Sequence, residues 1–92
     1  MLTKARSPYN EPMTVRLRLF SSMRNAVGQA DIQWQEPVRN AQQLWEALAQ
    51  RYPQLKPLSA SRVVAVNRKH APLDHPLRAG DEVAFFPPVS GG

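Results

Sequence analysis

The chain has 92 residues, a formal net charge of +5 and no cysteine. This length supports a single domain, and the missing cysteine excludes disulfides, thiolate zinc sites and cysteine nucleophiles. No apolar run approaches the roughly 18 residues of a membrane span, and the N-terminus lacks the apolar stretch of a secretory signal. We therefore expect a cytoplasmic protein without a membrane partner.

The basic side chains give little sign of nucleic-acid binding. They are scattered from Lys4 to Arg78, and no aromatic residues interleave with them as stacking platforms for bases. A basic surface of this kind is also suited to steering a protein toward an acidic partner. We therefore expect a protein partner and no nucleic acid.

The first twelve residues differ in pattern from the eight that follow. Residues 1–12 contain two prolines and several polar residues without periodicity, which predicts a disordered N-terminal extension. Residues 13–20, MTVRLRLF, alternate strictly between apolar and polar side chains, which predicts a half-buried strand. Arg16 and Arg18 fall on the solvent side of that strand.

A short helical turn and a second strand are predicted next. Ser21 or Ser22 can cap the turn, and Gly28 can end it in the left-handed conformation. Residues 29–36, QADIQWQE, alternate again. Pro37 should stop this strand, because proline lacks the N–H that a sheet ladder needs.

The main helix of the chain is predicted over residues 41–52. Asn40 resembles an N-cap, and Gln43 completes a variant capping box. Pro53 follows at once and prevents the helix from continuing. The apolar residues of this segment recur at helical spacing and should lie across the sheet: they are Ala41, Leu44, Trp45, Leu48 and Tyr52.

A third strand and an irregular connection follow the helix. Residues 62–67, RVVAVN, are apolar and β-branched enough for an inner strand, and one short edge strand is expected near residues 71–73. His70 and His75 lie in the connection, where two solvated loop histidines are a better interpretation than a pair of metal ligands. We therefore predict no metal site.

The last strand is predicted at residues 82–86, EVAFF, after a turn with Gly80 at a positive φ. Neighbouring strand residues point to opposite faces, so Phe85 should face the core and Phe86 the other side. At this stage Phe86 has two interpretations: it covers the second face of the sheet, or it anchors a partner.

The element order predicts the fold class. One main helix and four or five strands indicate an α+β domain over residues 13–86, with the helix packed on one face of a mixed sheet. The β-grasp (ubiquitin-like) arrangement fits this order. In that arrangement the first and last strands run parallel and side by side at the centre of the sheet.

Residues 87–92, PPVSGG, form a predicted extended tail. Pro87 and Pro88 fix φ near roughly −65° and lack an N–H, so the ladder cannot continue normally and the chain is aimed outward. Six extended residues reach at most roughly 20 Å. That distance is enough to enter the active site of another protein.

The tip of this tail is slender. Gly91 and Gly92 have no Cβ, so their backbone can pass through a narrow channel, and Ser90 adds little bulk. A carboxylate is a poor electrophile, but once it is adenylated AMP can leave and a sulfur or nitrogen nucleophile can replace it. A terminal Gly-Gly on a stalk is therefore suited to being activated and loaded by another enzyme.

The stretch GDEVAFFPPVSGG, residues 80–92, closely resembles the C-terminus of the MoaD family, the small sulfur-carrier subunits of molybdopterin synthase. The resemblance extends over roughly residues 13–92. LFSSMRNAVG is similar to the family's first-strand end and short helix, LWEALAQRYP to its main helix, and RVVAVN to its third strand. Residues 1–12 have no counterpart in the usual pattern.

The resemblance implies a ubiquitin-like fold and a role in molybdenum cofactor biosynthesis. It implies that a MoeB-like enzyme adenylates Gly92 with ATP, that a persulfide donor converts it to a thiocarboxylate, and that this chain binds no cofactor. The loaded tail would enter the large subunit, MoaE, in a two-plus-two heterotetramer and give sulfur to cyclic pyranopterin monophosphate, with the catalytic residues on MoaE. The residues that we predict to bind a partner are Phe86, Pro87, Pro88, Val89, Ser90 and Gly91.

Other uses of the same tail stay open. A related ubiquitin-like carrier could serve another sulfur pathway, such as thiazole or cysteine synthesis. Alternatively, Gly92 could join a lysine through an isopeptide bond, as in a protein modifier. Tails similar to ThiS share the Gly-Gly, but the FFPPVSGG approach favours the MoaD family.

Overall fold

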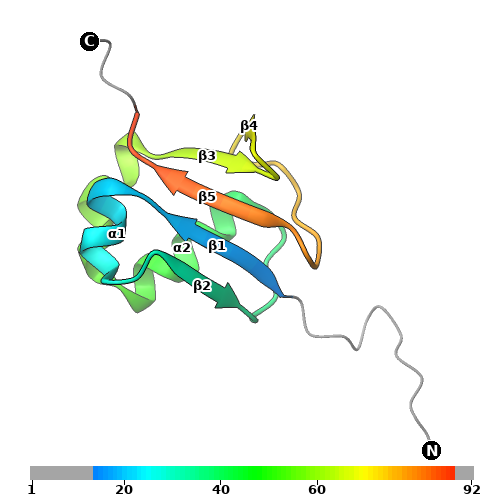
Figure 1. The fold of residues 1–92 in the computed structure, drawn as a ribbon, viewed down its shortest axis with the longest axis horizontal. Coiled ribbons are helices and arrows are strands. Elements are labelled where there is room, and N and C mark those ends of the chain that lie inside the picture. Colours follow the sequence, from blue (N-terminus) through cyan, green and yellow to red (C-terminus); the bar gives the residue numbers. More distant parts are fainter. Residues whose placement is uncertain (1–13, 89–92) are drawn as a thin grey trace, which may run out of the picture.

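The structure, a computed structural model, describes residues 14–88 and consists of a five-stranded sheet with helices on one face (Figure 1). It confirms the α+β class. The predicted extension 1–12 and the tail residues 89–92 lie outside the described residues. The elements in chain order are β1 (Val15–Leu19), α1 (Ser21–Val27), β2 (Asp31–Trp34), α2 (Ala41–Arg51), the 3-10 segment η1 (Pro53–Ser61), β3 (Val63–Val66), β4 (Lys69–Ala71) and β5 (Glu82–Phe86).

The sheet is mixed, with the strand order β2-β1-β5-β3-β4. The first and last strands, β1 and β5, are parallel neighbours, and every other pairing is antiparallel. Parallel neighbours require a crossover connection, which here contains all the remaining elements. This is the β-grasp arrangement that the element order predicted.

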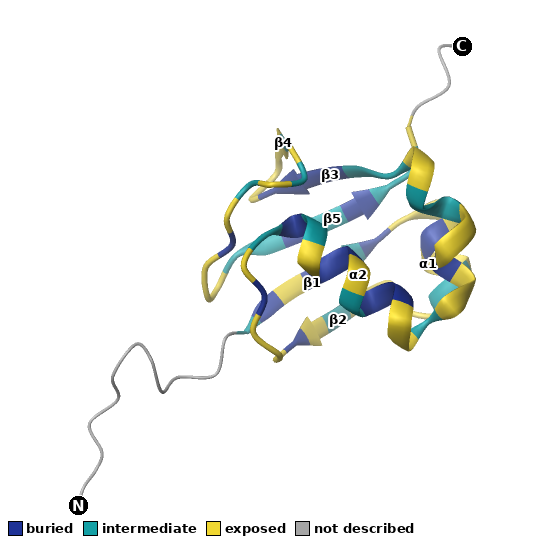
Figure 2. Cartoon of the chain, turned by 180° about the vertical axis from the view of Figure 1, so that it is seen from behind, coloured by how far each residue is buried: buried dark blue, intermediate teal, exposed yellow. Residues whose placement is uncertain are grey.

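The register of β1 against β5 separates the two faces of the sheet. Leu17 pairs with Val83, and these side chains are fully buried beneath the helices. Arg18 pairs with Ala84 and points to the opposite face, as side chains alternate along a strand. Figure 2 shows α2 lying across one face of the sheet, with α1 at one end of the strands. We call the other face, which carries Arg18 and Ala84, the open face.

Helix α2 begins and ends as its sequence indicates. The Asn40 side chain accepts a hydrogen bond of 2.8 Å from the Gln43 backbone N–H, which confirms the N-cap. The Gln43 side chain reaches back to the backbone N–H of Arg39, also at 2.8 Å, one residue before the cap. The helix ends at Arg51, with Tyr52 as its C-cap, because Pro53 cannot continue it.

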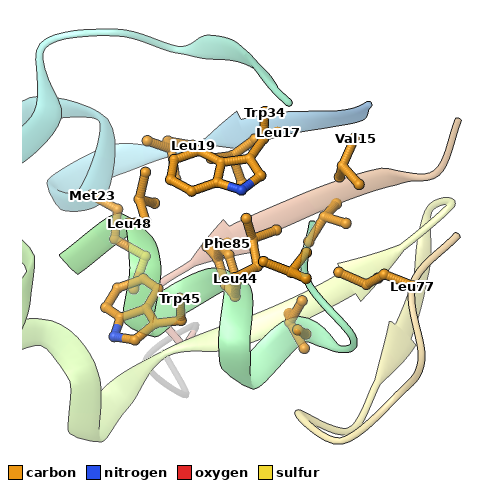
Figure 3. Close-up of a cluster of buried hydrophobic side chains, with 14 of the residues drawn as sticks. Val15, Leu17, Leu19, Met23, Trp34, Leu44, Trp45, Leu48, Leu77 and Phe85 are labelled. Atoms are coloured by element: carbon orange, nitrogen blue, oxygen red, sulfur yellow. The ribbon is translucent and has the colours of Figure 1, made fainter. Parts of the chain in front are cut away.

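The core lies between α2 and the covered face of the sheet (Figure 3). The rings of Trp45 and Phe85 meet edge to face with centroids 5.0 Å apart, an arrangement that aromatic quadrupoles favour. The Trp45 indole N–H donates to the hydroxyl of Ser59 at 2.8 Å, so its polar atom is satisfied. Leu77, in the connection before β5, completes the core and is 7% exposed. Trp45 is thus a core residue, as expected.

One local prediction near the helices is wrong, and one segment was not predicted. Neither Ser21 nor Ser22 caps α1; the N-cap position is Phe20, which makes no side-chain cap bond. The nine-residue segment η1 was not predicted, because only Leu55 of it is buried and its sequence has no clear period. Pro53 ends α2 but is tolerated at the start of η1, where its missing N–H costs nothing. Gly28 does end α1 with φ 88°, as predicted.

The edge strand β4 lies two residues earlier than expected. Asn67 and Arg68 have φ of 52° and 71°, so two residues suffice for a tight hairpin turn, and β4 starts at Lys69. His70 therefore lies in a strand, which corrects its assignment to a loop; His75 does lie in a connection. No helix within residues 14–88 is long and apolar enough to span a bilayer.

Candidate docking face and the base of the tail

The predicted tail departs from the end of β5. Phe86 is the last residue of this strand and pairs with Val63 of β3. Pro87 is half-buried and Pro88 is exposed, and they are the last residues described. Neither can donate a ladder hydrogen bond, so the sheet ends here. The other predicted site residues, Val89, Ser90, Gly91 and Gly92, lie outside the described residues.

Phe86 is half-buried on the open face, between two other rings. Its ring lies perpendicular to that of Phe20, with centroids 6.3 Å apart, and to that of His70, at 5.9 Å. A hydrogen bond of 3.3 Å from the Phe20 backbone N–H to the Phe85 carbonyl extends the β1–β5 pairing and holds Phe20 in place. Phe20 is 41% exposed. The open face thus presents two neighbouring phenylalanines beside the start of the tail.

A hollow of about 590 Å³ lies next to these rings on the open face. Ala84 points into it, with Arg18 beside it on β1 and Ala65 beside it on β3. Because the side chains at Ala84 and Ala65 are small and the surrounding ones are large, the face is depressed at this point. The hollow is lined by Arg18, Phe20, Ser21, Arg68, Glu82, Ala84, Phe86, Pro87 and Pro88.

The charged side chains of the hollow form a chain of ion pairs. Arg18 Nε lies 3.3 Å from Asp31, and Arg18 Nη1 lies 3.7 Å from Glu82. Arg68 Nε lies 3.9 Å from the same Glu82 carboxylate. The Arg18 guanidinium also stands 5.7 Å from the centre of the Phe20 ring. Aromatic residues and arginine are enriched at protein interfaces, and both line this hollow.

Sequence reasoning identified Phe86, Pro87 and Pro88 but missed the rest of the hollow. Phe20 could have been found, because the alternation of MTVRLRLF places it on the same side as Arg16 and Arg18. The proximity of Arg18 to the Phe20 ring was also missed, although the two residues lie two apart along the chain. Within residues 14–88 no three histidine or acidic side chains gather to hold a metal ion.

Comparisons with known proteins identify the family of the chain. The model of the ThiS family matches residues 17–92. The chain is 36% identical over 75 residues to the molybdopterin synthase sulfur carrier subunit of Haemophilus influenzae, covering 79% of this chain and 93% of that protein.

Solved structures of similar proteins have the same fold. A chain of the complex of subunits 1 and 2 of the molybdopterin-converting factor from Helicobacter pylori superposes with a TM-score of 0.62 and 26% identity, covering 87% of this chain and 100% of that one. The small archaeal modifier protein SAMP1 of Haloferax volcanii superposes with a TM-score of 0.73 and 26% identity. The match covers 86% of this chain and 99% of that one. The family match and the Haemophilus relative together show that the chain belongs to the ThiS family and, within it, to the MoaD-type sulfur carriers.

Proposed function

We propose that this protein is the sulfur-carrier subunit of a molybdopterin synthase. The observation that carries the proposal is the family match, which runs through the tail to Gly92. The Haemophilus relative, which is named for this role, supports it. The position of Pro87 and Pro88 at the free end of β5, beside the hollow, also supports it, because a tail that starts there leaves from a face that a partner can cover.

In this proposal Gly92 is the reacting residue and other proteins perform the chemistry. A MoeB-like enzyme transfers AMP from ATP to the carboxylate and releases pyrophosphate. The outer sulfur of a persulfide then displaces AMP and forms an acyl disulfide. A thiol attacks the inner sulfur of that disulfide, forms a new disulfide with it and releases the thiocarboxylate. The large, MoaE-like subunit takes the loaded tail, and its own residues move the sulfur to cyclic pyranopterin monophosphate. Glycine suits this role because the terminal carbonyl has no neighbouring side chain.

The open face would be the surface on which the large subunit docks. Phe20 and Phe86 offer apolar area next to the tail, and the 590 Å³ hollow can accept an apolar side chain of the partner. Aromatic anchors seated in such depressions carry much of the energy of protein interfaces. In the Helicobacter pylori complex the two subunits of the converting factor are found together, and we extend that association, in a two-plus-two heterotetramer, to this chain.

Intact-mass spectrometry tests the proposal. The full chain is incubated with ATP, the adenylating enzyme from the same organism, a persulfide donor and a thiol that can cleave the acyl disulfide. Exchange of one oxygen for sulfur adds about 16 mass units and supports a sulfur carrier. Activity of the loaded chain with the large subunit and pterin substrate then identifies the client. If the mass of the chain does not change although the adenylating enzyme and the persulfide donor are shown to be active, the proposal is contradicted.

Deletion of Gly92 is the matched variant. We expect sulfur delivery to be abolished, because the new terminus is one residue short of the reacting position and the attacking groups tolerate little displacement. The melting temperature should stay unchanged, since residues 14–88 contain the whole described core. Sulfur transfer by the truncated chain at the wild-type rate would place the reacting atom elsewhere.

A second candidate function is that of a protein modifier. The similarity to SAMP1, with 26% identity and a TM-score of 0.73, supports this second candidate. In this case the adenylated Gly92 would react with a lysine amine, and an isopeptide bond would form as AMP leaves. Ligation to lysine side chains in the mass experiment would support the modifier. Sulfuration with delivery to a thiazole or cysteine pathway would support a carrier with another client.

A further inference from the structure

Arg68 occupies a backbone conformation that its side chain does not favour. Within residues 14–88 three residues other than glycine have a positive φ, and Arg68 has the largest value, 71°. A left-handed conformation costs a residue with a Cβ roughly 1–2 kcal/mol. In a two-residue hairpin turn, glycine is strongly preferred at this second position. The hairpin alone therefore does not require an arginine here.

The other residue of the turn has a structural reason for its place. Asparagine tolerates positive φ better than most residues. The Asn67 amide also donates a hydrogen bond of 3.0 Å to Asp81 and accepts one of 3.0 Å from the Glu82 backbone N–H. These bonds tie the hairpin to the start of β5. Among the described residues Arg68 makes no comparable bond: its side chain is 82% exposed, and its contact with Glu82 is 3.9 Å long.

The position of Arg68 indicates a different role. Its side chain lines the hollow and is the last member of the ion-pair chain, after Glu82. Glu82 already has Arg18 at 3.7 Å, and Arg18 also has Asp31 at 3.3 Å. Two acidic groups are thus shared by two arginines, and the exposed Arg68 has the longest of these contacts. Such an exposed pair contributes little to folding, so the charge of Arg68 stays available to another molecule.

We propose that Arg68 is kept in its unfavourable conformation because its guanidinium binds a carboxylate of the large subunit that docks on the open face. This inference rests on the proposed function. An acidic partner group follows from charge, since Arg68 is the most exposed charge of the hollow. When docking excludes water from the hollow, the ion pair strengthens, because the local dielectric constant falls. A guanidinium can also hold a carboxylate through two parallel hydrogen bonds.

Three substitutions at one position separate binding from folding. Arg68→Gly removes both the charge and the unfavourable conformation, Arg68→Ala removes only the charge, and Arg68→Lys keeps the charge. We expect Arg68→Gly to melt at or above the wild-type temperature and above Arg68→Ala. Arg39→Ala is the control: it removes one exposed charge beside the N-cap of α2, outside the lining of the hollow.

Binding is measured between the full chain and the large subunit from the same organism, at 0.05 M and at 0.5 M salt. At low salt we expect Arg68→Gly and Arg68→Ala to weaken binding about tenfold, the effect of one charge-assisted pair. The affinity of Arg68→Lys should stay within about threefold of the wild-type value. Arg39→Ala should bind as tightly as the wild type. At high salt the difference between wild type and Arg68→Gly should shrink, because salt screens the pair.

The outcomes distinguish this inference from the proposed function. If the wild type binds the large subunit and Arg68→Gly binds equally well at low salt, the role of Arg68 is refuted and the carrier function stands. If Arg68→Gly and Arg68→Ala both melt well below the wild type, Arg68 is structural and the inference also fails. If the wild type does not bind the large subunit at either salt concentration, the proposed function and this inference fail together.

Discussion

Phe85 and Phe86 are neighbours in β5, yet they belong to two faces of the sheet with different roles. Phe85 is fully buried and packs edge to face on Trp45 beneath α2. Phe86 is half-buried, contacts Phe20 and His70, and borders a hollow that no described element fills. The comparison shows that the covered face supplies the fold. The open face keeps apolar area and charge partly exposed, so these groups contribute less to folding.

The largest stability effect is expected on the covered face. Phe85→Ala removes a fully buried ring and leaves a cavity under α2, so the free energy of unfolding should fall by about 3–5 kcal/mol. A domain of this size is stable by only about 5–10 kcal/mol in total. Chemical denaturation followed by tryptophan fluorescence, which reports on Trp34 and Trp45, measures the change.

Phe85→Leu is the milder companion, in case the alanine variant does not fold. It keeps most of the apolar volume and should lower the free energy of unfolding by about 1–2 kcal/mol. A loss below about 1 kcal/mol for Phe85→Ala would contradict the assignment of stability to the covered face.

Phe86→Ala should have a small effect on the free energy of unfolding and a large effect on binding of the large subunit. The half-buried ring contributes about 1 kcal/mol to folding by its area, but as an interface anchor it should weaken binding of the large subunit at least tenfold. Titration calorimetry and thermal melting on the same preparation compare the two effects. A large drop in melting temperature with unchanged affinity would instead assign Phe86 to the monomer core.

The two faces were unequally predictable from the sequence. The covered face follows from local periodicity, because alternation in β1 and β5 and the helical spacing in α2 put Leu17, Leu44 and Phe85 on the buried side. The parallel pairing of β1 with β5 joins segments more than sixty residues apart, so it came from the element order and not from any local pattern. The tail was visible because proline and glycine restrict or free the backbone by themselves.

The hollow was not predictable, for a physical reason. It depends on which side chains flank Ala84 across the sheet, and those neighbours, Arg18 and Ala65, belong to other strands. Arg68 reaches the hollow only because the turn before β4 is tight, whereas the sequence had suggested a longer connection. A short strand such as β4 carries too few residues for alternation to fix its boundaries.

The smallest predicted effect comes from a control variant that is destabilised about as much as Phe86→Ala. Asn40→Ala removes the side chain that accepts the Gln43 N–H and should lower the free energy of unfolding by about 1 kcal/mol, about the same as Phe86→Ala. Asn40 lies at the N-terminus of α2, outside the lining of the hollow, so binding of the large subunit should be unchanged. Any loss of binding in Phe86→Ala beyond that in Asn40→Ala then arises from the contact itself, because both variants are destabilised equally. Equal losses in the two variants would mean that binding follows stability, and that the open face has no separate role.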